Sequence, residues 1–183
     1  EWRNLRHPFR PQEIFSDDKI AAMHDMALKV LEELGLKVLL KDARDIYAKG
    51  GARVDDDMVY IGRDLVEAAI ASVPSSIHLR APASDRDLVL EDGALVFGPG
   101  AGCPNATDLV SGRRPGSLKG FENALRLCQS FDVIHKHGPC CEPQDVPVHL
   151  RHYDMMRSQL ALSDKFPFIY GRGPQQVAES FEM

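Results

Sequence analysis

The chain has 183 residues, of which 44% are hydrophobic and 27% charged, a composition typical of a globular protein with a substantial core. Its net charge of −5 argues against a nucleic-acid-binding protein, and no apolar run approaches the roughly 18 residues of a membrane span. No signal peptide is recognisable, and the four cysteines form no CxxC pair, which favours free thiols in a reducing cytoplasm. Because the chain lacks an initiator methionine and stops inside a predicted helix, we expect a fragment of a longer protein.

The first half of the chain predicts a small layer of helices and strands after an extended lead-in at residues 1–11. Its clearest element is a helix that is capped by Ser16, carries one apolar face and ends at Gly35. The other predicted elements are a strand at 36–40, a helix from Asp42 to Gly50, extended pieces at 52–54 and 58–61, a helix at 63–72, a strand at 77–81, and a hairpin of 88–90 with 95–97 turned at Asp92-Gly93. Asp55, Asp56 and Asp57 lack the spacing of a calcium loop, so a solvated hairpin turn is expected there.

The second half predicts alternating strands and helices. Ser117 caps a helix that reaches about residue 131, a strand follows at 133–135, and Pro147 begins a helix that reaches about residue 162. A further strand is predicted at 168–170, and Pro174 begins the next helix. Successive strands start about 34 to 38 residues apart, which indicates parallel strands joined by helical crossovers.

The predicted fold class is therefore α/β. Residues 1–94 form an N-terminal α+β layer, and residues 95–183 form the first βα units of a TIM (β/α)8 barrel, truncated in this chain, or the first half of an open sheet. Unusual loops follow the three predicted strands, at residues 98–108, 138–145 and 171–173. In a barrel these loops emerge at the face where active sites are built.

We expect the side chains of these loops to converge on a ligand. The candidate binding residues are Phe97, Gly100, Gly102, Asn105, Asp108, Glu142, Gln144, Asp145, Tyr170 and Arg172. The alternative is that Asp145 only caps the following helix and that Arg172 only pairs with a neighbouring carboxylate.

A histidine and cysteine cluster offers a second, weaker hypothesis. His135 and His137 point the same way on an extended strand, and Cys140 and Cys141 follow closely. No second ligand set has zinc-site spacing, so we expect no metal, buried thiols and hydrogen-bonded histidines. His152, on the next helix, is expected to face solvent or a partner.

Four blocks of sequence together resemble the trimethylamine methyltransferase family. They are residues 8–36 (PFRPQEIFSDDKIAAMHDMALKVLEELGL), 96–117 (VFGPGAGCPNATDLVSGRRPGS), 129–135 (QSFDVIH) and 141–168. The resemblance covers essentially the whole chain, with one departure at Phe166, where a second proline is expected. It implies a cytoplasmic TIM-barrel enzyme of one-carbon metabolism or methanogenesis. Such an enzyme moves a methyl group from trimethylamine, glycine betaine or a similar quaternary amine to a corrinoid (cobalamin) carried by a partner protein, with no cofactor bound covalently.

The resemblance also implies that the catalytic residues lie beyond Met183, where trimethylamine-specific members carry pyrrolysine, so this chain is expected to be inactive alone. A quaternary ammonium is held by aromatic faces and negative charge, which Phe97 and Tyr170, and Glu142, Asp145 or Asp108, would supply. A betaine carboxylate would need Arg172 or N–H groups of the glycine loop. Two rivals stay open: a metal-dependent barrel lyase or hydrolase using His135, His137 and Cys140, and a non-catalytic binding or assembly module. No membrane or nucleic-acid partner is expected, and homo-oligomer formation is left open.

Overall fold

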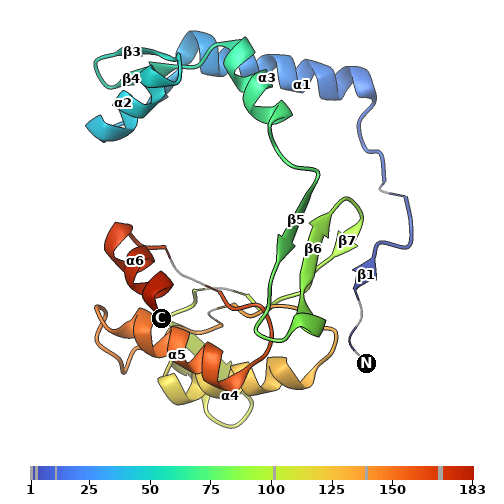
Figure 1. Cartoon of the computed structure of the whole chain (residues 1–183), viewed down its shortest axis with the longest axis vertical. Coiled ribbons are helices and arrows are strands. Elements are labelled where there is room, and N and C mark those ends of the chain that lie inside the picture. Colours follow the sequence, from blue (N-terminus) through green and yellow to red (C-terminus); the bar gives the residue numbers. More distant parts are fainter. Residues whose placement is uncertain (1, 3, 11, 101, 139, 169–170) are drawn as a thin grey trace. The chain divides into compact units, whose positions relative to one another are not determined.

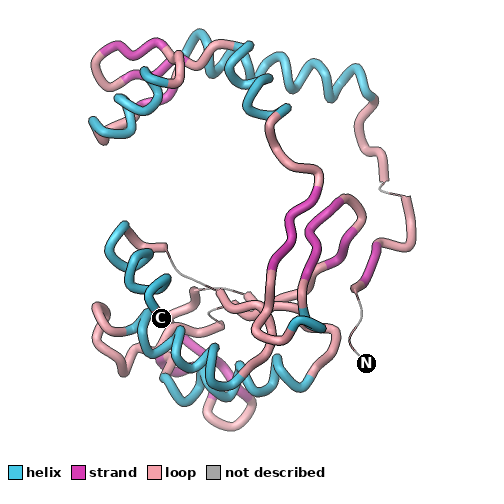
Figure 2. Tube along the Cα trace, in the orientation of Figure 1, coloured by secondary structure: helices cyan, strands magenta, loops and turns pink. Residues whose placement is uncertain are grey.

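The computed structural model describes residues 2, 4–10, 12–100, 102–138, 140–168 and 171–183. The chain divides into two compact units. One unit is Phe9–Pro74, and the other combines Glu1–Pro8 with Ser75–Met183. Helices and strands are mixed in both units (Figure 1 and Figure 2), so the α/β class is confirmed at this level. The predicted boundary after residue 94, between an N-terminal layer and the start of a catalytic domain, stays a prediction.

The Phe9–Pro74 unit contains three helices and a three-stranded antiparallel sheet among its described residues. The helices are α1 (Asp17–Lys29, continued by the π-helical turn η1, Val30–Leu34), α2 (Lys41–Lys49) and α3 (Arg63–Ala71), and the sheet order is β2 (Leu36–Lys37), β4 (Met58–Tyr60), β3 (Arg53–Asp55). Gly35 ends the first helix at φ 72°, as predicted. A Cβ there would lie 2.7 Å from the carbonyl oxygen of Val59, so the position requires glycine.

Two details of the first helix differ from the prediction. Ser16 occupies the N-cap position, but its side chain makes no capping hydrogen bond. The predicted apolar face is also largely uncovered, because Ile20 and Met23 stay about half exposed and Leu28 is the buried residue of α1. By contrast, the aspartate turn is confirmed, since Asp56 has φ 51° between β3 and β4.

The second unit begins with two short antiparallel strand pairs. β5 (Ser76–Leu79) pairs with β6 (Leu88–Glu91), and β1 (Leu5–Arg6) pairs with β7 (Ala94–Leu95), with the 3-10 turn η2 (Ser84–Arg86) between β5 and β6. The turn at Asp92-Gly93 is where it was predicted, but β6 and β7 each pair with a different strand. The predicted hairpin was wrong because the chain start, expected as a lead-in, supplies the partner of β7.

Helices form the core of this unit. α4 (Leu118–Ser130) packs against α5 (Arg151–Leu162), and α6 (Pro174–Glu182) contacts α5. Phe121 and Leu125 of α4 are buried together with Met155 of α5. The hydroxyl of Ser117 accepts the Gly120 N–H at 3.1 Å, as expected for the N-cap of α4.

The start of α5 was predicted four residues too early. Residues 147–150 form a separate turn in which the Leu150 N–H donates to the Pro147 carbonyl at 2.9 Å, and the α-helix begins at Arg151. Asp145 does not cap this helix. Its carboxylate accepts the Leu118 N–H at 2.9 Å and so caps the first turn of α4 instead.

The strands predicted at 133–135 and 168–170 were wrong for the residues that the structure describes, because Val133 lies in a turn and Phe168 lies outside any strand. Of the strand predicted at 95–97, only Leu95 belongs to a strand, β7.

Isolated backbone contacts join these segments. The Phe97 carbonyl accepts the His135 N–H at 2.8 Å, and the His137 N–H donates to the Phe166 carbonyl at 3.0 Å. Lys136 and Phe166 also form a parallel bridge. These contacts link residues 97, 135–137 and 166 without forming a regular sheet among the described residues, so the parallel strands of a barrel stay a proposal. Residues 169 and 170 of the third predicted strand lie outside the described residues.

Two further β-strands form an exposed hairpin, β8 (Asn105–Asp108) with β9 (Gly112–Pro115). Within the described part of the chain, every helix is too short or too polar to span a bilayer.

Candidate functional site

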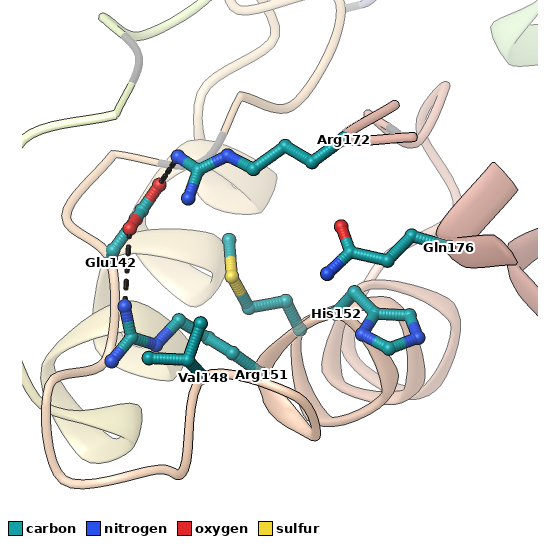
Figure 3. Close-up of a pocket in the computed structure, with 7 residues that line it drawn as sticks. Glu142, Val148, Arg151, His152, Arg172 and Gln176 are labelled. Carbon is teal, nitrogen blue, oxygen red and sulfur yellow. Dashed lines mark hydrogen bonds and ion pairs between the residues drawn. The ribbon is translucent and has the colours of Figure 1, made fainter. Parts of the chain in front are cut away.

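A small pocket of about 40 Å³ lies beside helix α5 (Figure 3). It is lined by Glu142, Val148, Arg151, His152, Met155, Arg172 and Gln176. Glu142 and Val148 come from the loop between α4 and α5, three side chains come from the first turns of α5, and Arg172 and Gln176 come from the start of α6 and the residues before it. The second and third of the predicted loops therefore meet here.

Glu142 is the electrostatic centre of the pocket. It is only 6% exposed, and its two carboxylate oxygens are shared between two arginines. Nη1 of Arg151 lies 3.3 Å from one oxygen, and Nη2 of Arg172 contacts the other. Nη2 of Arg151 also donates to the Val146 carbonyl at 3.2 Å, so this guanidinium joins Glu142 to the loop before α5.

The first predicted loop supports Glu142 through its backbone. The Glu142 N–H donates to the Cys103 carbonyl at 2.8 Å, and Cys103 and Cys141 form a parallel bridge. Gly116 also packs closely against the backbone of Glu142, because a Cβ at this position would lie 2.4 Å from the Glu142 carbonyl oxygen. The loop after β7 therefore shapes the pocket from outside it, as a support for Glu142.

His152 is buried, contrary to the expectation that it faces solvent or a partner. Its Nε2 lies 2.6 Å from Oε2 of Glu179 on α6, and its ring packs on Tyr153. Hydrogen bonds from Gln175 and then His152 hold the pKa of the Glu179 carboxyl below its usual range. This pair joins α5 to α6. The prediction failed because sequence spacing does not show that α6 returns to cover α5.

Two predicted carboxylates bind other groups of the chain and do not line the pocket. Asp108 accepts the backbone N–H groups of Val110 at 2.9 Å and Ser111 at 2.6 Å and pairs with Arg114. The Ser111 N–H, with the other partners, lowers the pKa of the Asp108 carboxyl. Asp145 caps α4, as described above.

The other predicted residues also lie outside the pocket lining. Phe97 is 44% exposed and stacks on His135, and Gln144 donates from its amide to the Glu142 carbonyl at 3.1 Å. Asn105 is paired in the β8–β9 hairpin, Gly100 is exposed, and Gly102 adopts φ 74°. Tyr170 lies outside the described residues. Of the predicted set, the structure brings together Glu142 and Arg172.

Sequence reasoning missed Arg151 and Gln176. A signal for the α5 side of the pocket was present, because residues 151, 152 and 155 share one face of a helix. Nothing in the local sequence identifies that face as the one turned to Glu142.

The histidine and cysteine cluster is held by hydrogen bonds. Nδ1 of His135 accepts the Phe97 N–H at 3.0 Å, and Nε2 of His137 contacts the Ser163 hydroxyl. Across the residues that the structure describes, no three metal-ligating side chains of His, Cys, Asp or Glu gather around one point. The four cysteines are free thiols.

A thiol beside this cluster has a perturbed pKa. Hydrogen bonding from Cys140 and then His137 lowers the pKa of Cys128 to about 5, and the same contact raises the pKa of Cys140. Lys165 is only 1% exposed. Its Nζ donates to the backbone carbonyls of Cys128, at 2.6 Å, and Phe131, at 2.7 Å. Burial lowers the pKa of Lys165. These contacts fix the C-terminal end of α4.

Comparison with known proteins identifies the family. A family model described as trimethylamine methyltransferase (MTTB) matches residues 1–183. A glycine betaine methyltransferase of Desulfitobacterium hafniense (strain Y51) is 30% identical over 171 residues, covering 93% of this chain and 36% of the relative. A trimethylamine methyltransferase MttB of Desulfitobacterium hafniense (strain DSM 10664 / DCB-2) is 34% identical over 137 residues, covering 72% and 27%.

An L-carnitine:corrinoid methyltransferase of Eubacterium limosum is also similar, with 26% identity over 152 residues that cover 83% of this chain and 31% of the relative. The chain thus spans about a third of the length of these relatives. Since the family model extends over all 183 residues, the chain belongs to the trimethylamine methyltransferase family.

Proposed function

We propose that the full-length protein transfers a methyl group from a methylated amine, such as trimethylamine, glycine betaine or a related quaternary amine, to a corrinoid carried by a partner protein. The observation that carries this proposal is the match of the family model to the whole chain. The names of the relatives support it, since they are methyltransferases of glycine betaine, trimethylamine and L-carnitine, the last named as corrinoid-dependent. We also propose a TIM barrel, whose first parallel strands would pass through Phe97, Lys136 and Phe166.

The proposed reaction needs little covalent chemistry from the protein. The corrinoid is a second substrate, which supplies a nucleophilic cobalt, and the amine leaves with the electron pair of the broken C–N bond. The protein must then hold the methyl group in line with the cobalt and exclude water. The residues that complete this task are expected beyond Met183.

Within this chain, Phe97 and Tyr170 remain the aromatic candidates for contact with the ammonium group. In this proposal Glu142 has a different role from the contact with a quaternary ammonium that the sequence predicts. Its charge is already compensated by Arg151 and Arg172, so it would hold these arginines rather than face an ammonium ion. Asp108 and Asp145 would each have to weaken a hydrogen bond to bind a cation. In this proposal the protein is cytoplasmic and acts with the corrinoid protein as its partner.

The test uses the full-length protein with the corrinoid protein reduced to the cob(I)alamin state. Trimethylamine, glycine betaine and L-carnitine are added in turn, and the change in corrinoid absorbance and the demethylated amine are measured together. We expect stoichiometric methyl transfer from at least one of these amines. Absence of transfer from all of them, while a relative of known activity methylates the same corrinoid protein, would exclude the proposed reaction. The isolated 183-residue chain serves as a control and is expected to be inactive.

A further inference from the structure

Cys103 and Cys141 lie opposite each other on neighbouring extended segments of the chain. They form a parallel bridge, and the Glu142 N–H beside it donates to the Cys103 carbonyl at 2.8 Å. Neighbouring strands are about 4.7–4.9 Å apart in such a pairing. A disulfide bond joins Cα atoms that are about 4.4–6.8 Å apart, so the backbone positions of the two cysteines meet the distance that a disulfide requires.

The side-chain surroundings of the two cysteines differ. Cys103 is exposed, and Cys141 is buried. Two glycines leave the space that Cys141 occupies, because a Cβ at Gly116 would lie 3.3 Å from the Cys141 Cβ and a Cβ at Gly120 would lie 3.9 Å from its Sγ. Burial raises the pKa of the Cys141 thiol, and the charge of the nearby Cys103 thiolate adds to that increase. The two sulfur atoms are therefore close enough to interact electrostatically.

Cys140 precedes Cys141 in the chain but belongs to a different group of side chains. Its Sγ donates to the Gly138 carbonyl at 3.4 Å, and its thiol also hydrogen-bonds to Cys128. Its backbone has φ 41°, a left-handed conformation that residues other than glycine adopt rarely. Cys103 thus has Cys141 as its neighbour across the bridge, while Cys140 and Cys128 form a second pair beside the last turn of α4.

We propose that Cys103 and Cys141 form a reversible redox site, in which a low-molecular-weight disulfide such as oxidised glutathione converts the two thiols into a disulfide bond. The exposed Cys103 thiolate attacks one sulfur of oxidised glutathione, whose S–S bond breaks, so that a mixed disulfide forms and one glutathione thiolate leaves. The Cys141 thiol then loses its proton and attacks the Cys103 sulfur, and the second glutathione thiolate leaves. Two cysteine thiols are oxidised, one glutathione disulfide is reduced, and the two released thiolates take up the two cysteine protons.

The disulfide joins the first predicted loop covalently to the second, at the residue before Glu142. In the reduced protein this junction is held by the hydrogen bond between the Glu142 N–H and the Cys103 carbonyl. Such an amide exchanges its hydrogen with solvent only when the two segments separate. Oxidation should therefore slow hydrogen exchange at the Glu142 amide by about tenfold or more. It also fixes the backbone that carries the Glu142 carboxylate, which Arg151 and Arg172 contact.

The test uses the full-length protein, equilibrated with mixtures of reduced and oxidised glutathione, alkylated, and digested without reduction. Mass spectrometry should find the peptides of Cys103 and Cys141 joined and two hydrogen atoms lighter than their sum, and dithiothreitol should separate them. Cys103→Ser and Cys141→Ser should each abolish the joined peptide and the slowed exchange of the Glu142 amide. The matched controls Cys128→Ser and Cys140→Ser should retain both.

Three results would overturn the proposal. They are a disulfide between Cys128 and Cys140 as the main product, glutathione attached to Cys103 without a bond to Cys141, and thiols that stay reduced in every mixture. The peptide map does not depend on catalysis, so it is separate from the test of methyl transfer. A bond between Cys103 and Cys141 in a protein that transfers no methyl group would keep the redox site and exclude only the proposed reaction.

Discussion

Replacing Glu142 by glutamine tests how strongly one buried carboxylate holds the pocket together. The substitution keeps the shape of the side chain and removes its charge. Removing one partner of a buried ion pair costs about 3–5 kcal/mol, whereas an exposed pair contributes about 0.2–1 kcal/mol. The Arg151 partner is 13% exposed and the Arg172 partner 52% exposed. We therefore expect Glu142→Gln to lower the free energy of unfolding by about 3 kcal/mol, mostly through Arg151.

Double-mutant cycles separate the two contacts. Glu142→Gln is combined in turn with Arg151→Met and Arg172→Met, and the coupling free energy of each pair is measured. The coupling with Arg151 should be about 2–3 kcal/mol, and the coupling with Arg172 at most about 1 kcal/mol. Added salt should weaken the Arg172 coupling more, because only that guanidinium is substantially exposed to solvent.

Trp2 provides the assay. It is the single tryptophan of the chain, belongs to the unit that contains the pocket, and lies 5.0 Å from the His135 ring. Its fluorescence during urea titration reports this unit, whereas circular dichroism sums both. A coupling with Arg172 that equals or exceeds the coupling with Arg151 would refute the assignment of Arg151 as the buried partner.

Three further predictions concern the surroundings of the pocket. Gly116→Ala should destabilise the unit by about 1–3 kcal/mol in the same titration, because the new Cβ would meet the Glu142 carbonyl; an unchanged midpoint would contradict this contact. Lys165→Met should cost about 2–4 kcal/mol, since two hydrogen bonds to a charged donor are lost and only partly offset by the buried charge removed; a stabilised variant would show that desolvation prevails. Alkylation of Cys128, measured by mass spectrometry, should stay constant from pH 8 to 6 and fall only as pH drops through about 5, where its thiolate is protonated; a loss of reactivity between pH 8 and 6 would refute this.

Local elements of the fold could be predicted from the sequence because their signals are local. The 3.6-residue periodicity before Gly35, the capping hydroxyl of Ser117 and the proline at the start of α6 act within one turn of chain. Strand pairing could not be predicted in the same way. β7 pairs with β1, so that Leu95 lies opposite Leu5 although the two are far apart in the sequence. No local pattern in either strand selects the other as its partner.

The site could be predicted in outline only. The loops after the strands were expected to converge, and Glu142 and Arg172 do lie together. The sequence does not show, however, which carboxylates already accept hydrogen bonds from other parts of the chain. The Asp108 carboxylate accepts a backbone N–H of its own turn, and the Asp145 carboxylate accepts the N–H of Leu118, 27 residues earlier, at the start of α4. Both hydrogen bonds satisfy backbone N–H groups whose positions depend on the folded backbone.

The glycine-rich loop illustrates how a predicted binding loop can act indirectly. Its Cys103 carbonyl fixes the Glu142 N–H, and Gly116, just after the β8–β9 hairpin, leaves room for the Glu142 carbonyl. The side chain of Glu142 is consequently aimed at Arg151 and Arg172 by contacts that involve no charge. Since the loop backbone determines where the carboxylate lies, substitutions there should change the contacts of Glu142 with Arg151 and Arg172 indirectly. The glycines and prolines of this segment would then serve to hold the backbone rigid rather than to bind the ligand.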